Sequence, residues 1–184
     1  MIKKADAAWA VKIINTPTEA FNDPTVVYDG KYIIDGHHRW SKAYALNGKD
    51  CKIKILNFPA VSGVSWEDML KAVQLAIVAT APGTKLYNPV GKDNMLADDG
   101  TASEEYYIEN ACDEVVQAMK EKGRGETKEE QGKFVHKNVA DMKSTSTPVA
   151  GAKPRAVMPQ IPSEKQGGGE TTALLKKAVI DLTK

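Results

Sequence analysis

Two short runs of β-branched and aromatic residues constrain this chain more than any other feature of its sequence. The first run is Thr25–Tyr28 and the second is Lys31–Ile34, with Asp29-Gly30 between them. An Asp-Gly pair is typical of the tight turn that joins two antiparallel strands, because both residues tolerate the positive φ angles that such a turn needs. The sequence therefore predicts a β-hairpin.

The segment after the hairpin predicts a loop, a helix and another strand. An apolar helical face and a natural stop at Gly48 indicate a helix from about His37 to Asn47. Lys52–Phe58 alternates polar and apolar residues, which is the period of a strand with one buried face. We expect this strand to pair with the hairpin.

Helical patterns flank this central unit on both sides. Apolar residues spaced four apart predict an opening helix that ends near Asn15. Later in the chain, a Ser or Thr is followed three positions on by an acidic residue, which is the spacing of a helix capping box. The pairs are Ser65 with Asp68, Thr101 with Glu104, and Thr127 with Glu130; apolar residues at helical intervals follow them through Ile77, Met119 and Met142.

These elements predict an α+β fold, with a small mixed sheet, packed helices and a helical C-terminal extension. At 184 residues the chain is long enough for one ordinary domain with appendages. We divide it into a domain at 1–90, an acidic helical pair at 91–142, a Pro- and Gly-rich linker at 143–172 and a C-terminal helix at 173–184. The last helix has an apolar stripe with no neighbour in sequence to cover it, so we expect the tail to bind other protein subunits.

Charge and composition exclude several classes of protein. Gly91 to Met142 holds 7 basic against 13 acidic residues, the wrong sign for a helix pair that reads DNA, so charge does not support nucleic acid as a partner. No run of eighteen apolar residues exists, so no membrane span is expected. Cys51 and Cys112 lie far apart, which argues against a disulfide framework or a zinc site and favours a cytoplasmic location.

The loop between the hairpin and the next helix carries the chemistry. In Asp35-Gly36-His37-His38-Arg39, unpaired N–H groups and the positive end of the helix dipole would point outward, which suits a phosphate group. Gly36 lets the backbone approach a ligand, and Arg39 and the histidines add donors. Asp35 is suited to hold Mg²⁺ or to accept a proton. The simpler alternative is that Asp35 only caps the helix and the histidines are solvated.

The run Tyr-Ile-Ile-Asp-Gly-His-His-Arg-Trp around this loop resembles the central motif of the ParB/sulfiredoxin superfamily. Its paired histidines are similar to the variant in ParB-like phage proteins and free-serine kinases. The resemblance implies a nucleotide-phosphate site that takes ATP, ADP or CTP with Mg²⁺. The expected site residues are Asp35 and His37 for catalysis, Gly36, His38 and Arg39 for the cofactor, and Asp35 for the metal ion.

The resemblance leaves the reaction open, because the superfamily includes CTP-dependent clamps, reductases, kinases and claimed nucleases. The loop has no cysteine, which disfavours a reductase, and few residues precede the hairpin, so the usual first strand is not expected. Our leading hypothesis is a phage-type protein of the host cytoplasm that binds nucleotide, with phosphotransfer or nucleotide hydrolysis as candidate activities. The alternative is a non-enzymatic structural component of a phage assembly, incorporated in the virion.

Overall fold

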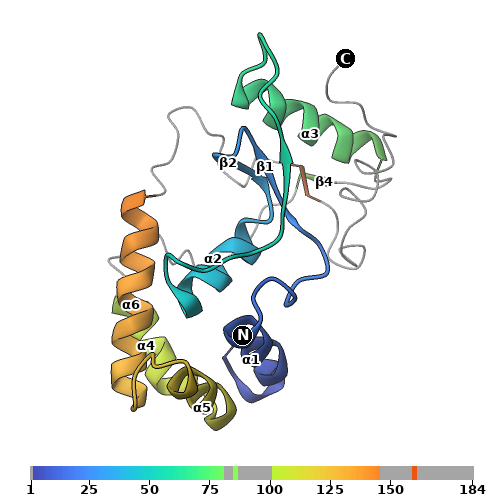
Figure 1. Cartoon of the computed structure of the whole chain (residues 1–184). Coiled ribbons are helices and arrows are strands. Elements are labelled where there is room, and N and C mark those ends of the chain that lie inside the picture. Colours follow the sequence, from blue (N-terminus) through green and yellow to red (C-terminus); the bar gives the residue numbers. More distant parts are fainter. Residues whose placement is uncertain (1, 81–84, 87–100, 146–158, 161–184) are drawn as a thin grey trace. The chain divides into compact units, whose positions relative to one another are not determined.

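The computed structural model describes residues 2–80, 85–86, 101–145 and 159–160. In these residues the fold is α+β, as predicted, with a small mixed sheet and several helices (Figure 1). The chain forms two compact units, each assembled from distant parts of the sequence. The helical unit takes residues 1–21, 38–54 and 92–147, and the sheet unit takes residues 22–37, 55–91 and 148–184.

The sheet unit contains the predicted hairpin. β1 (Thr25–Tyr28) pairs antiparallel with β2 (Tyr32–Asp35), and Asp29 and Gly30 between them have φ angles of +53° and +64°. The predicted pairing of the next strand is also confirmed: β3 (Ile55–Phe58) runs parallel to β1 on its other side, giving the order β2-β1-β3 within the described residues. β3 begins at Ile55, three residues later than the alternating pattern suggested.

A helix with a complete capping box packs in the same unit. α3 (Trp66–Thr80) follows Ser65, whose hydroxyl accepts a hydrogen bond from the Asp68 N–H at 3.1 Å and donates one to the Asp68 carboxylate at 2.7 Å. The hydrogen bonds that the Ser65 hydroxyl and the Ser65 N–H donate to the carboxylate hold the pKa of Asp68 below its usual value. The core between α3 and the sheet consists of buried apolar side chains: Val26, Tyr28, Ile34, Met69 and Val73.

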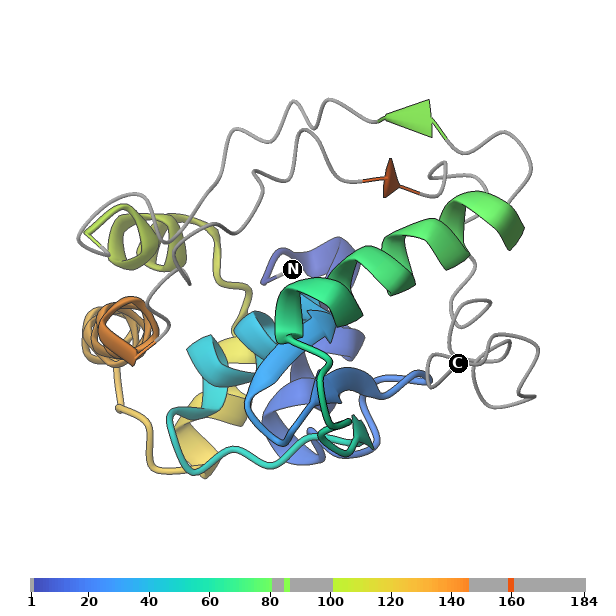
Figure 2. The same cartoon turned by 90° about the horizontal axis from the view of Figure 1, so that it is seen from above.

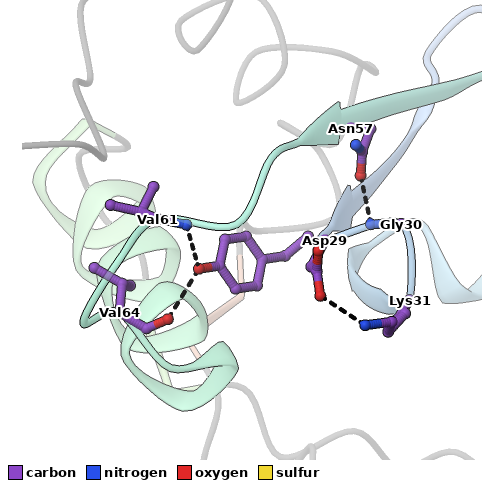
Figure 3. A network of polar contacts seen from close by, with 7 residues as sticks. Asp29, Gly30, Lys31, Asn57, Val61 and Val64 are labelled. Atoms are coloured by element: carbon purple, nitrogen blue, oxygen red, sulfur yellow. Dashed lines mark hydrogen bonds and ion pairs between the residues drawn. The ribbon is translucent and has the colours of Figure 1, made fainter.

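Tyr28 fixes the segment that connects β3 to α3. Its hydroxyl donates a hydrogen bond to the carbonyl of Val64 at 2.9 Å and accepts one from the N–H of Val61 at 3.0 Å; Figure 3 shows both main-chain partners. At the turn, Gly30 donates to the Asn57 side chain at 2.8 Å, and Lys31 pairs with Asp29 at 2.9 Å. Side chains of β1 and β3 therefore order both the hairpin turn and the entry to α3.

Replacement of Tyr28 by Phe should destabilise the protein by about 1–2 kcal/mol, because two main-chain groups lose a partly buried partner. Chemical denaturation measures this loss, and amide exchange at Val61 should accelerate with it. Tyr32→Phe is the matched control, since the Tyr32 hydroxyl has no hydrogen bond within the described residues and its ring stacks on Trp66. Equal stability of the two variants would contradict the role of Tyr28.

The helical unit is built around two helix pairings. α1 (Ala7–Asn15), preceded by the short 3-10 turn η1 (Lys4–Asp6), packs against α5 (Asp113–Glu121), and α4 (Thr101–Asn110) packs against α6 (Lys128–Thr145). Figure 2 views α6 nearly along its axis, with α4 beside it. α2 (His37–Asn47) contributes most of its length to this unit, with the bounds that the sequence predicted. The residues of its core with the lowest exposure are Ala10, Ile13, Ile14, Ala43, Leu46, Tyr107, Val115, Met119, Val139 and Met142.

The predicted pair of helices in 91–142 is wrong in number, because residues 101–145 form three helices. The expected helix through Met119 is interrupted at Ala111-Cys112, where Cys112 is extended, with a φ of −79° and a ψ of 164°. Tertiary contacts satisfy the backbone at this break: the Cys112 N–H donates to the carbonyl of Ile2 at 3.2 Å, and the Lys128 ammonium donates to the carbonyl of Ala111 at 2.6 Å. Apolar periodicity continues across the break and so did not reveal it.

Gln131 links the three helices through a fully buried side chain. Its Oε1 accepts a hydrogen bond from the Tyr107 hydroxyl at 2.7 Å, and its Nε2 donates to the carbonyls of Val116 at 3.0 Å and Gly125 at 2.9 Å. Burial raises the pKa of Tyr107. Each polar atom of this amide is therefore satisfied, as a buried polar group requires.

Gln131→Leu should lower the free energy of unfolding by at least about 2 kcal/mol, because a hydroxyl and two carbonyls lose their partner in the interior. Thermal and urea unfolding test this. Gln117→Leu provides the same substitution on the exposed face of α5 and should cost little. If both variants unfold alike, the network does not hold the helices together.

Several predictions concern the end of the compact part and the tail. Lys143–Thr145 belong to α6 and not to the linker, and the short strands β4 (Lys85–Leu86) and β5 (Pro159–Gln160) pair antiparallel. The predicted stop at Pro82-Gly83 and the C-terminal helix at 173–184 lie outside the described residues, so these two parts of the division stay predictions. In the described part, no helix has both the length and the apolar character to cross a membrane.

Candidate functional site

The strand-loop-helix predicted around Asp35 is present. β2 ends at Asp35, Gly36 has a φ of +92°, and α2 begins at His37. A φ of this sign is strained for residues with a Cβ, so glycine is the residue that lets the chain turn from strand into helix in one step. The five loop residues are consecutive, and the backbone alone keeps them together.

A β-bulge precedes this turn. Ile33 pairs with Val27, but Asp35 pairs with Val26, so Ile34 is an extra residue in β2. Ile34 points into the core and is 7% exposed. A bulge changes the direction of the side chains that follow it, and bulges are frequent beside functional sites. Here it sets the register at which Asp35 leaves the sheet.

The loop side chains differ in exposure. His37 and His38 are exposed, whereas Asp35, Gly36 and Arg39 are partly buried. Asp35, both histidines and Arg39 each take part in at least one further interaction. The division between the two compact units falls between His37 and His38, and the loop is continuous along its own backbone. In general, the N–H groups in the first turn of a helix have no carbonyl one turn earlier in the same helix to accept their hydrogen bonds.

The metal role predicted for Asp35 would have to rely on few protein ligands. Within the described residues, no group of three or more His, Cys, Asp or Glu side chains comes together. Mg²⁺ is commonly bound by one or two carboxylates together with substrate phosphates and water, so a single carboxylate fits a phosphate-bridging ion better than a resident one. The adjacent histidines point about 100° apart on a helix, which does not suit one shared ion.

A surface pocket lies inside the helical unit. It has a volume of about 350 Å³ and is lined by residues from the ends of α1, α2 and α5, among them Cys51 and Arg124. None of the five loop residues lines it. Sequence analysis did not identify this pocket; the available signals were Gly48 and Gly123, each a helix stop followed shortly by basic residues.

Comparison of the chain with protein-family models, with curated proteins and with solved structures gives no match.

Gly36→Ala should destabilise the protein by about 1–3 kcal/mol, because alanine is strained at a φ of +92°. Gly36→Asn should recover part of this loss, since asparagine tolerates positive φ better than alanine. Urea unfolding of the three proteins tests the order Gly, Asn, Ala. Full stability of the alanine variant would show that the loop does not need glycine.

Proposed function

We propose that this protein binds the phosphate groups of a nucleotide at Asp35–Arg39. The observation that carries the proposal is the glycine turn, with a φ of +92° at Gly36, that leads directly from β2 into the first turn of α2. A helix N-terminus reached through glycine presents N–H groups and a positive partial charge to an anion, without a Cβ in the way.

Each loop residue has a role in this proposal. Gly36 allows the phosphate to approach the backbone, and His38 and Arg39 donate hydrogen bonds to its oxygens. Asp35 holds a Mg²⁺ ion that bridges phosphates, or accepts a proton from an attacking hydroxyl, with His37 as a second acid-base group. These roles support phosphotransfer or nucleotide hydrolysis as the proposed activity.

The resemblance of the nine residues around the loop to the ParB/sulfiredoxin motif supports a nucleotide over other phosphates. ATP, ADP and CTP with Mg²⁺ are the candidate ligands. The acidic stretch between Gly91 and Met142 weighs against a DNA clamp, and we therefore favour a phage-type protein that acts on a nucleotide in the host cytoplasm.

Arg39→Ala should abolish nucleotide binding while the protein stays folded, because the variant loses the bidentate phosphate donor. Calorimetric titration with ATP, ADP and CTP in Mg²⁺ measures this. Arg39→Lys keeps the charge but not the planar fork of donors, so its affinity for nucleotide should fall between that of the wild type and that of Arg39→Ala.

Lys71→Ala, which removes an exposed cation from α3, is the matched control and should bind as the wild type does. Unchanged affinity in Arg39→Ala would reject the site. No heat with any of the three nucleotides would favour the alternative proposal of a non-enzymatic component of a phage assembly, whose tail contacts other subunits.

A further inference from the structure

The pocket in the helical unit is formed where three helices end. Ile14, Asn15 and Pro17 come from the end of α1, Asn47 and Asp50–Lys52 from the end of α2, and Lys122 and Arg124 from the end of α5. All of these residues belong to one compact unit. The volume of the pocket, about 350 Å³, is in the range of small-molecule sites.

The walls of the pocket are fixed by helix caps. After α5, Gly123 has a φ of +66° and donates to the Lys120 carbonyl at 2.8 Å, while the Arg124 N–H donates to the Met119 carbonyl at 3.0 Å. These two bonds form a Schellman motif, which places Arg124 beside the last turn of the helix. After α2, Gly48 has a φ of +80° and donates to the Tyr44 carbonyl at 2.7 Å.

The charge of the pocket is positive, with Lys52, Lys122 and Arg124 against Asp50. Helix carboxyl ends carry partial negative charge, so cations there have a structural explanation. The helix dipole does not, however, supply hydrogen-bond acceptors for the Arg124 guanidinium. Many carbonyls at the ends of these helices already accept hydrogen bonds from other groups. Their donors are the N–H groups of Thr16, Gly48, Gly123 and Arg124 and the side-chain amides of Asn47 and Asn138.

Arg124 is the unusual member of the pocket. It is partly buried, and its one polar side-chain contact among the described residues is from Nη1 to the Met119 sulfur at 3.9 Å, a weak acceptor. Asp50 lines the same pocket but forms no ion pair with Arg124. Burial lowers the pKa of Arg124, and the charge interaction with a Cys51 thiolate opposes this shift. A guanidinium has five donors, and most of those of Arg124 have no acceptor among the described residues.

We infer that this pocket binds a small oxyanion, a phosphate or carboxylate group, through the Arg124 guanidinium with Lys52 and Lys122 at its rim. Both oxyanions match the planar fork of arginine. Asn47 favours a ligand that also carries a hydroxyl or amine, because its Nδ2 is committed to the carbonyls of Ile13 and Ala43 and its Oδ1 remains as an acceptor. This inference is independent of the proposed nucleotide loop.

Titration of the full chain with inorganic phosphate, and separately with acetate, tests the inference at constant ionic strength. Two-dimensional NMR should show the backbone N–H signals of Cys51 and Arg124 shifting to saturation with at least one of the two ions. Phosphate alone would assign the site to phosphate groups, and acetate alone to carboxylates. Shifts that rise linearly without saturation with both ions would overturn the inference.

Arg124→Gln should weaken this binding by roughly tenfold or more, since it loses the charge-assisted fork. Lys133→Gln removes the same charge from the exposed face of α6 and should leave the affinity unchanged. Lys122→Gln changes an exposed residue at the pocket rim and provides a second test if Arg124→Gln does not fold; several-fold weaker binding is expected. Equal affinity in the pocket variants and in Lys133→Gln would overturn the site.

Arg39→Ala separates the two sites. It should leave the phosphate shifts at Cys51 and Arg124 intact even if it abolishes nucleotide binding at the loop. Loss of those shifts in Arg39→Ala would assign them to the loop and would overturn the pocket.

Discussion

β1 determines the organisation of the sheet unit, because all four of its residues are buried and it bonds to β2 on one side and β3 on the other. Its pairing with β2 sets the bulge at Ile34 and so the point at which Asp35 leaves the sheet. Its last residue, Tyr28, bonds the segment before α3 through one hydroxyl. The hairpin, the loop and the entry to α3 all depend on this single strand.

The helical unit depends on side chains that bond to main-chain groups far away in the sequence. Asn138 of α6 donates to the Ala45 carbonyl near the end of α2, and Asn47 of α2 donates to the Ile13 carbonyl near the end of α1. Gln131 of α6 donates to the carbonyls of Val116 in α5 and of Gly125, which follows α5. Buried helix ends need such partners, because their terminal carbonyls have none inside the helix.

The two anion sites that we propose use opposite ends of helices. At Asp35–Arg39, the start of α2 provides N–H donors and a favourable dipole, and side chains add to them. In the pocket, three helices contribute their carboxyl ends, so binding there must come from side-chain cations that overcome the dipoles. The first site is therefore encoded locally, whereas the second exists only through packing.

The sequence by itself determined the hairpin, the bounds of α2, the capping box at Ser65, the N-cap at Thr127, and the order of the loop residues. These features depend on residues within a few positions of one another, so propensity and spacing are sufficient to predict them. Tertiary structure decided the break at Cys112 and the approach of Cys51 to Arg124. Each of these depends on groups many residues away, such as the Ile2 carbonyl at the break, and no local pattern contains that information.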